Sequence, residues 1–278
     1  MSDDLSAALL AHFGERGLHS LPIAPAGPLR SPGLPLQVGP YFRSAEPSEP
    51  LSLGEYAAEQ GLDAGPMAGQ LRIGTDRGAQ FYFAPDRSVR AVVLGTDLPE
   101  LAVNSGVEAF AAGLLLLDGQ LPAVSDTQDE DAALAAYRQL RQGLLDLDPA
   151  AFEDRESWWP RVLDDLRRPL NIDSSAAFEY VDEHGEKKIV TGGSGIGTAH
   201  PEELVWHRLR AAGVEPEQVT QVYCELEPCL MPGHYCALWL AETFPDARFT
   251  HSFDYGRTAE SREEGIKALM ISLAERHG

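Results

Sequence analysis

The cysteines of this chain lie close together in the sequence. All three occur in "YCELEPCLMPGHYC", residues 223–236 of a 278-residue chain. Clustered thiols indicate a metal site, a disulfide or a redox pair. Three cysteines in so long a chain do not predict a disulfide framework. The residue types around them must decide between the remaining interpretations.

A histidine and a carboxylate upstream complete a possible zinc site. A catalytic zinc ion takes three protein ligands and leaves a fourth position for water. Cys229 and Cys236 supply two thiolates, and His200 in "TAHPEEL" supplies an imidazole. Pro201 favours an extended His200 and suits the first position of a helix, so Glu202 falls in the first turn. We therefore expect His200, Cys229 and Cys236 to bind zinc, with Glu202 beside them as the catalytic carboxylate.

Six residues separate Cys229 from Cys236, and this spacing requires a loop. In a continuous helix the two α-carbons would lie roughly 10 Å apart, too far for both thiolates to bind one zinc ion at about 2.3 Å. Pro232 and Gly233 favour a break in the helix and an unusual backbone conformation. We expect Cys229 to end a strand and Cys236 to begin the next helix.

Three nearby side chains receive other interpretations. Cys224 lies five residues before Cys229 on a predicted strand, so we expect it on the opposite face as a buried small hydrophobe. His207 is expected in the core or in solvent. His234 could replace a cysteine in a distorted site, but we expect it to line the substrate pocket.

The order of these residues along the chain resembles a known signature. A histidine, a glutamate two residues later and a downstream Pro228-Cys229 resemble H-x-E followed by P-C-x-x-C, the pattern of zinc-dependent nucleoside and nucleic-acid deaminases. The stretches "SGIGTAHPEEL", "YCELEPC", "PGHYC" and "FDYG" resemble the deaminase modules of bacterial polymorphic toxins. The resemblance covers about residues 174–278. It departs from the signature in the number of residues between the cysteines.

This resemblance implies a Zn²⁺ cofactor and hydrolytic deamination of a nucleobase, cytosine in preference to adenine. Zinc lowers the pKa of its bound water toward neutrality. Glu202 would take the proton and return it to the ring nitrogen and the departing ammonia, as the ring carbon that carries the amino group is attacked.

Two features could bind the substrate. The glycine-rich "TGGSGIGTAH" leads into the His200 helix, and Gly195, Gly197 and Thr198 could present backbone N–H groups to a phosphate or sugar, although a tight turn explains the glycines equally well. On "RFTHSFDYG" the aromatic side chains of one strand face, among them Phe253 and Tyr255, could stack on a base. Core packing is the alternative for this face.

Charge and composition limit the possible partners. The formal net charge is −21, which excludes the broad basic stripe of a nonspecific nucleic-acid binder. The N-terminal "MSDDLSAALLAHFGERG" lacks a basic region and the longest apolar run is too short to span a bilayer. We expect a cytoplasmic protein without a conventional signal peptide, or one exported by a dedicated secretion system.

The chain divides into two predicted domains, residues 1–170 and 171–278. In the first, a helix over about residues 3–16 precedes a Pro- and Gly-rich stretch expected to be loop and edge structure. A β meander follows, in "LRIG", "QFYFAP" and "VRAVVLG", and then a helix that Gly119 should stop. Two more helices follow, the second ended by Pro169 and carrying two tryptophans expected to pack in the core.

The first domain resembles the SUKH superfamily of bacterial immunity proteins over about residues 36–168. This resemblance implies an α+β domain, a sheet with covering helices, that binds a cognate toxin or immunity protein. In the second domain the predicted order ββαβαβα indicates an α/β fold with a mixed sheet in a three-layer, deaminase-like arrangement.

Two hypotheses follow for function. In the first, the chain is a deaminase that acts on a nucleotide or single-stranded nucleic acid, with an interaction domain ahead of it. In the second, it is a non-catalytic immunity or interaction protein that retains a degenerate deaminase scaffold. A closed structural zinc site, or no metal, is the corresponding alternative for the cysteines, and it would leave Glu202 without a role.

Overall fold

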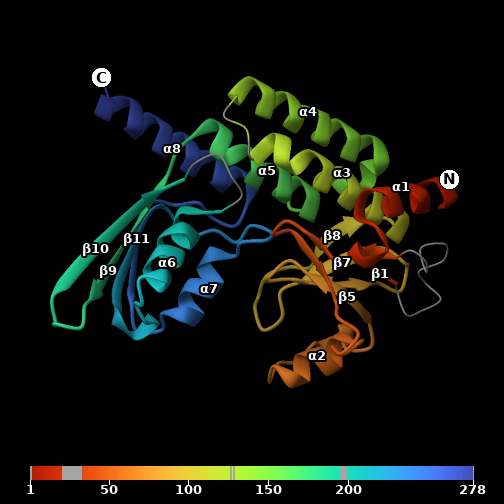
Figure 1. Cartoon of the computed structure of the whole chain (residues 1–278), viewed down its shortest axis with the longest axis horizontal. Helices are drawn as coiled ribbons and strands as arrows, with labels where there is room; N and C mark the ends of the chain where they lie inside the picture. The colour runs from red at the N-terminus through yellow and green to blue at the C-terminus, as the bar shows by residue number, and fades with distance from the viewer. Residues whose placement is uncertain (1, 21–32, 126, 128, 195–198, 278) are drawn as a thin grey trace. The chain divides into compact units, whose positions relative to one another are not determined.

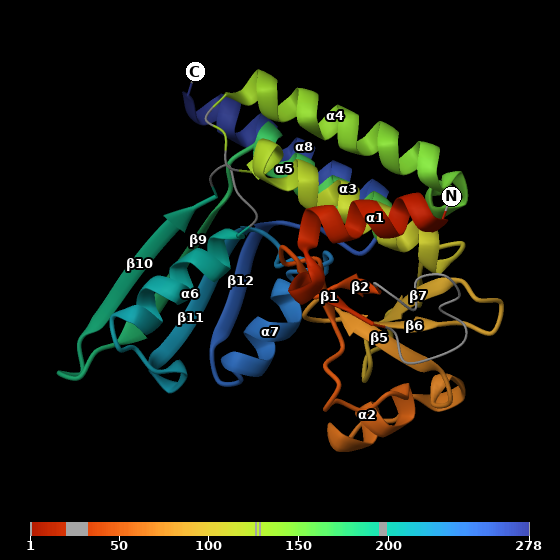
Figure 2. The same ribbon diagram turned by 45° about the vertical axis from the view of Figure 1, so that its right-hand side comes forward.

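A computed structural model describes residues 2–20, 33–125, 127, 129–194 and 199–277. The chain splits into two compact units, Met1–Asp164 (unit 1) and Asp165–Gly278 (unit 2). Figures 1 and 2 show the elements of both units, coloured along the chain. The predicted fold classes are confirmed, since each unit combines helices with a sheet.

Unit 1 contains two sheets and most of the helices of the chain. The helices that start in unit 1 are α1 (Ser2–Phe13), α2 (Leu53–Glu59), α3 (Val107–Ser125), α4 (Glu130–Leu147) and α5 (Trp158–Asn171). The strands are β1 (Leu18–His19), β2 (Leu34–Pro35), β3 (Gln37–Val38), β4 (Phe42–Ser44), β5 (Leu71–Thr75), β6 (Gln80–Phe83), β7 (Val89–Val92) and β8 (Leu101–Asn104). The first two strands pair with each other, and β3 to β8 form a six-stranded antiparallel sheet in sequence order. This sheet contains the meander predicted from the sequence.

An aromatic cluster forms the core of unit 1. Phe81 lies on the sheet, Phe110 on α3 and Trp158 at the start of α5, and each is buried. Phe81 stacks on Phe110 at 5.5 Å and meets Trp158 edge to face at 5.2 Å. The indole Nε1 atoms of Trp158 and Trp159 donate to Asp76 and Asn104, each at 2.8 Å. Because both indoles are buried and their polar atoms are paired, the predicted core role of the tryptophans is confirmed.

Several boundaries in unit 1 differ from the predictions. Helix α3 continues past Gly119 to Ser125 and includes Pro122, and α5 continues past Pro169 to Asn171. In the described part of the Pro- and Gly-rich stretch, β2 and the edge strand β3 agree with the expected loop and edge structure, and Leu34 and Val38 on these strands are fully buried. Burial of apolar surface outweighs local helix and strand propensity at these positions.

Helix α3 has the length and composition of a membrane span, the only such helix among the described residues. Its buried face packs in unit 1, with Phe110, Leu114 and Leu117 fully buried. The core of unit 1 therefore accounts for the apolar character of α3.

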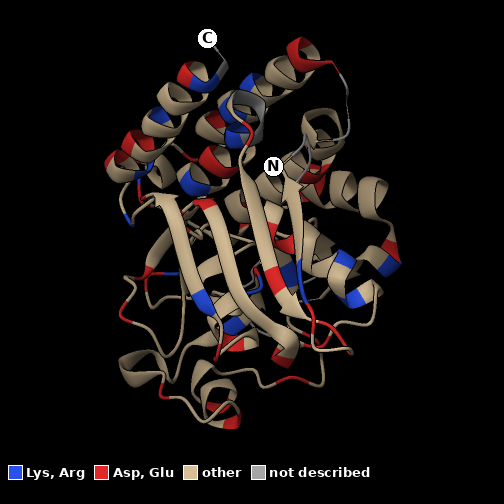
Figure 3. Cartoon of the chain, turned by 90° about the vertical axis from the view of Figure 1, so that its left-hand side faces the viewer, with Lys and Arg blue, Asp and Glu red and all other residues tan. Residues whose placement is uncertain are grey.

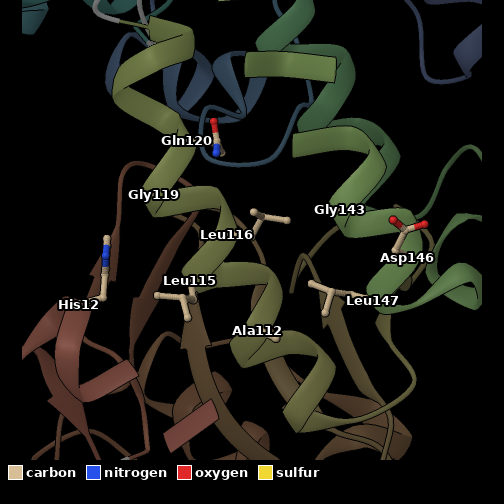
Figure 4. A pocket seen from close by; sticks show the side chains of 9 residues that line it. All are labelled: His12, Ala112, Leu115, Leu116, Gly119, Gln120, Gly143, Asp146 and Leu147. Atoms are coloured by element: carbon tan, nitrogen blue, oxygen red, sulfur yellow. The ribbon is translucent and has the colours of Figure 1, made fainter. Parts of the chain in front are cut away.

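A largely apolar pocket of about 600 Å³ lies beside α3 in unit 1. Figure 4 shows Leu115 and Leu116 of α3 and Leu147 of α4 lining it, with His12 of α1 at one side. His12 Nε2 lies 2.8 Å from Asp118 Oδ2. The pocket thus combines an aliphatic wall with a histidine whose ring contacts Asp118, a residue outside the lining.

Unit 2 is built on a four-stranded mixed sheet. Its strands are β9 (Ser175–Val181), β10 (Lys187–Gly193), β11 (Val219–Leu226) and β12 (Arg248–Phe253), in the order β10-β9-β11-β12. The first three strands pair antiparallel, and β11 and β12 pair in parallel. The helices are the end of α5, α6 (Pro201–Ala211), α7 (Cys236–Thr243) and α8 (Ala259–His277). This order and the mixed pairing confirm the α/β prediction.

Helices α6 and α7 lie side by side along the sheet in both views (Figures 1 and 2). Val205 and Leu209 of α6 belong to one buried cluster with Val222 and Leu226 of β11. Burial of this face fixes α6 and α7 against the sheet, so that the residues at their N-termini have defined positions.

Candidate functional site

Three side chains from separate segments of unit 2 converge on one point. His200, Cys229 and Cys236 are all buried, and their donor atoms lie within 4.8 Å of one another. His200 Nδ1 is 3.4 Å from Cys229 Sγ and 3.4 Å from Cys236 Sγ. Ligands at ordinary Zn–N and Zn–S bond lengths lie about 3.6 Å apart around a tetrahedral ion. One nitrogen and two sulfurs at these separations fit a zinc ion.

The start of α6 positions His200. The residue is extended, with φ −76° and ψ 157°, and Pro201 occupies the first helical position, as expected from the X-Pro pair. Its backbone N–H donates to Glu203 Oε2 at 2.9 Å, which pairs a donor that the helix leaves without a partner. The imidazole is thereby held at the mouth of a helix.

The loop between the cysteines contains two residues with left-handed backbone conformations. Gly233 has φ 78° and Tyr235 has φ 43°, both in the left-handed region. Cys236 begins α7 as predicted, and the backbone N–H of Ala237 donates to the carbonyl of Cys229 at 3.0 Å. The prediction that Cys229 ends a strand is wrong, because β11 stops at Leu226. The loop starts earlier and leaves room for both sulfurs to face His200.

The two thiols of the cluster differ in their electrostatics. Burial raises the pKa of the Cys236 thiol well above its ordinary value, and the hydrogen bond with Cys229 raises it further. Burial would raise the pKa of the Cys229 thiol, but the hydrogen bond from Cys236 and the imidazole of His200 lower it well below its ordinary value. A thiolate is the form of cysteine that binds a metal. Cys229 is therefore ready to act as a ligand.

A carboxylate behind His200 fixes which nitrogen faces the sulfurs. His200 Nε2 lies 2.9 Å from Asp165 Oδ1, and both side chains are buried. Burial would raise the pKa of Asp165, but His234 and His200 outweigh this effect and lower it well below its ordinary value. Burial would lower the pKa of the His200 imidazole, but Cys229 and Asp165 raise it above its ordinary value. A metal at Nδ1 would therefore displace a proton, while Asp165 holds the ring from its Nε2 side.

A second histidine stacks against the first. The rings of His200 and His234 are parallel within 10° and 3.9 Å apart. His234 Nδ1 lies 2.8 Å from Glu203 Oε2, and its Nε2 lies 3.3 Å from Asp165 Oδ2. Burial would lower the pKa of His234, but Asp165 and Glu203 raise it to about 10.

The described residues contain two groups of side chains that could hold a metal ion. Asp165, His200 and His234 also lie close enough to share an ion. A doubly protonated imidazole has no lone pair for a metal, so His234 serves as a cation between two carboxylates. The group formed by His200, Cys229 and Cys236 offers one nitrogen and two sulfurs, the donor types that zinc prefers.

Glu202 lies buried at the same helix start as His200. Its Oε2 atom has no hydrogen-bond partner among the described residues. Burial raises the pKa of the Cys224 thiol, and interaction with Glu202 raises it further. Cys224 is outside the metal groups of the described residues and is buried in the hydrophobic cluster of unit 2, as expected, while the nearby Glu202 contributes to the raised pKa of its thiol.

The remaining predicted substrate residues are less closely grouped. Gly195, Gly197 and Thr198 lie outside the described residues. Phe253 is half-buried against the core, and Tyr255 is buried two residues beyond the end of β12, so the alternating strand face stops short of it. The assignment of these residues and of His234 to substrate binding stays a prediction.

Two buried residues were missed by the sequence reasoning. Asp165 and Arg168 lie one turn apart on α5, upstream of the glycine-rich loop, and Asp165 contacts His200 directly. No spacing rule links a residue on α5 to a histidine 35 positions later. The contact exists only in the folded unit.

Fold and site together define a two-part protein, an antiparallel α+β unit followed by a mixed-sheet unit with a buried histidine–cysteine cluster. Residues 18–165, just over half of the chain, match the SUKH-4 immunity protein model, and residues 172–272 match a Xanthomonas-like deaminase model. The chain belongs to the SUKH-4 immunity protein family and carries a deaminase-family segment after it. No curated protein and no solved structure matches the chain.

Proposed function

We propose that unit 2 is a zinc-dependent hydrolytic deaminase that acts on a nucleobase, cytosine in preference to adenine. The observation that carries this proposal is the convergence of His200, Cys229 and Cys236 at donor separations of 4.8 Å or less. The deaminase-family match over residues 172–272 contains all three residues. The longer loop between the cysteines does not prevent their sulfurs from meeting.

Zinc is the cofactor that this donor set favours. One imidazole and two thiolates leave a fourth tetrahedral position open, which is the pattern of catalytic zinc sites. When bound, zinc lowers the pKa of a coordinated water molecule toward neutrality and so supplies the nucleophile.

The chain's own residues handle the protons. Glu202 Oε2 is buried and has no partner among the described residues, so it is available to accept a proton from water. The same oxygen then donates to the ring nitrogen, and a second transfer protonates the leaving amine. A carbon–oxygen bond forms, the carbon–nitrogen bond breaks, and ammonia and a ring carbonyl result.

The charge of unit 2 favours nucleotides or short single strands as substrates. Figure 3 turns the four-stranded sheet toward the viewer and shows acidic and basic residues interspersed on the described strands. The lysines of the β9–β10 hairpin are paired: Lys187 Nζ is 2.8 Å from Glu179, and Lys188 Nζ is 2.6 Å from Glu186. These cations already have carboxylate partners and are poorly suited to binding a long phosphate backbone.

Unit 1 supplies the interaction function in this proposal. Membership of the SUKH-4 family supports a toxin or immunity protein as partner and a toxin and immunity context for the proposed deaminase. We propose that the protein acts in the cytoplasm or is exported by a dedicated secretion system.

The alternative is a non-catalytic immunity or interaction protein. The observation that favours it is the extent of the SUKH-4 match, which covers more of the chain than the deaminase match. In that case unit 2 would keep its metal cluster as a scaffold only.

Ammonia release from purified protein distinguishes the proposed deaminase from the non-catalytic alternative. Wild type, Glu202→Gln and the exposed control Glu217→Gln would be offered cytidine, cytidine monophosphate, single-stranded DNA and RNA, and the adenine equivalents. We expect Glu202→Gln to lower the rate by about 10²- to 10⁴-fold while its zinc content matches wild type, and Glu217→Gln to change neither. Full zinc occupancy with no ammonia from any substrate would establish the scaffold alternative.

A further inference from the structure

Arg168 is a buried cation close to the candidate zinc site. It lies on α5 one turn after Asp165, and only 6% of its surface is exposed. Residues three apart on a helix share a face, so Arg168 lies on the face whose Asp165 accepts from His200. The guanidinium is therefore a neighbour of the metal cluster, although it lies outside the deaminase-family segment.

One edge of this guanidinium is empty. Nε and Nη2 of Arg168 are both buried and have no hydrogen-bond partner among the described residues. These two nitrogens form the edge that donates two parallel hydrogen bonds to acceptor oxygens. The edge is thus fully formed as a donor, and nothing in the described chain fills it.

Another arginine on α5 shows how the same edge is normally filled. Arg161 is equally buried, and its Nε and Nη2 lie 3.2 and 3.0 Å from Glu156 Oε2. Burial of a charged donor without a partner destabilises a protein, because the group loses its water and gains nothing in exchange. The contrast indicates that Arg168 is kept for a ligand rather than for the fold.

The position of Arg168 on α5 favours a ligand close to the metal cluster. Burial would lower the pKa of the guanidinium, but the ionisable groups near it raise the pKa above its ordinary value. These groups are Tyr255, Asp165, Cys229 and Glu202. Asp165, one turn earlier on the same face of α5, contacts His200 directly, so a ligand that fills the empty edge would lie beside the metal cluster, where the reacting ring binds in the proposed mechanism.

The two candidate rings differ at the atom that such a donor needs. Cytosine carries a 2-oxo group whose oxygen has two lone pairs, and adenine carries no oxygen. Both N–H groups of an arginine edge can donate to one carbonyl oxygen. We propose that Arg168 is a substrate-contacting residue that donates Nε–H and Nη2–H to the 2-oxo group of cytosine and so selects cytosine over adenine. This inference rests on the proposed deaminase function.

Binding measured without turnover tests the assignment. In a Glu202→Gln background, the full-length zinc-loaded protein would be titrated with cytidine, cytidine monophosphate and adenosine, with and without Arg168→Gln or Arg168→Lys. We expect both substitutions to weaken the binding of cytidine and of cytidine monophosphate by the same factor, about tenfold or more, and to leave the affinity for adenosine unchanged. Lysine keeps the charge but lacks the double-donor edge, so it should not rescue binding.

Controls separate recognition from folding. Arg161→Gln removes a satisfied buried arginine on the same helix, and we expect it to lower the melting temperature without changing cytidine affinity. The Arg168 variants should retain zinc and should not melt earlier than their parent. Loss of zinc or of folded protein in both Arg168 variants would show a structural role and overturn the assignment.

The remaining outcomes are also decisive. Weaker binding of cytidine monophosphate alone would mean a phosphate contact, and unchanged affinity for cytidine would mean no contact; either result overturns the proposal. Cytidine binding that depends on Arg168 in a protein that releases no ammonia would refute the deaminase while leaving the Arg168 contact in place. Ammonia release by wild type, together with cytidine binding that does not change in the Arg168 variants, would support the deaminase and refute the Arg168 contact.

Discussion

The imidazole of His200 illustrates how much of the candidate site depends on residues that are not ligands. Asp165 accepts from Nε2 at 2.9 Å, and His234 stacks on the ring at 3.9 Å. A ligand whose ring is fixed on the side away from the metal loses little freedom when the metal binds. The affinity of the site should therefore depend on Asp165 as well as on the three donors.

Asp165→Asn tests this dependence. The substitution keeps the size of the side chain but removes the carboxylate that holds the Nε2 proton, and we expect zinc affinity to fall about 10- to 100-fold. Competition with a chromophoric chelator measures it. Asp173→Asn, an exposed site near the end of α5, is the matched control and should bind zinc as wild type does. Equal affinity in both variants would remove Asp165 from the site.

Among the residues of the candidate site, the sequence could reveal only those whose spacing along the chain follows a known pattern. His200 and Glu202 were predicted because an X-Pro pair starts a helix, and Cys229 and Cys236 because clustered thiols need a shared role. Arg168 lies in a stretch interpreted as the end of a tryptophan-bearing helix. Its burial and its unpaired edge follow from tertiary packing, which no local pattern encodes.

Among the elements, α3 shows where local rules give way to packing. Gly119 and Pro122 would each end an isolated helix, yet α3 passes through both to Ser125. Leu114 and Leu117 are fully buried ahead of these residues, and Val124 is buried beyond them. The apolar pattern predicted the helix, and its tertiary contacts determined its length.

Two glycines in α3 should respond oppositely to alanine. A methyl group at Gly113 would lie 2.6 Å from Trp159 Cζ2, and that indole is held by its hydrogen bond to Asn104. We expect Gly113→Ala to lower the free energy of unfolding by about 1–3 kcal/mol. At Gly119 a methyl group would meet nothing within 4 Å, so Gly119→Ala should raise the free energy of unfolding by about 0.5–1 kcal/mol.

Urea unfolding followed by tryptophan fluorescence would measure both variants against wild type. Because the two substitutions are chemically identical and lie in one helix, the sign difference isolates the contact with Trp159. A gain in stability at Gly113 would mean that the indole moves aside freely.

For the whole molecule, the change of pattern near residue 170 predicted two halves of different architecture. A meander followed by helices and an alternation of strands with helices are distinguishable from periodicity alone. The exact division was harder to predict, because the boundary between the two compact units falls between Asp164 and Asp165, inside a continuous helix. A helix interior carries no turn or linker signal.

Metal removal should affect the two units differently. Zinc would add its binding free energy to unit 2, which contains all three donors, and not to unit 1. We expect a chelator to reduce hydrogen-exchange protection in residues 165–278 and to leave residues 2–164 as they were. Peptide-resolved mass spectrometry would show this, and added zinc, but not magnesium, should restore the protection. An equal loss in both units would contradict the assignment of the metal to unit 2.

The helix α5 also sets a condition on how such proteins can be recombined. Its first residues, Trp158 and Trp159, complete the aromatic core of unit 1, and its later residues, Asp165 and Arg168, belong to unit 2. A gene fusion that joined a new segment at residue 172 would leave the SUKH-4 half intact but would separate the deaminase-family segment from Asp165 and Arg168. A junction ahead of residue 158 would keep Asp165 and Arg168 with the second segment but would remove Trp158 and Trp159 from the first half. Exchange of segments in this architecture therefore requires that the helix be duplicated or that one half adapt to the other.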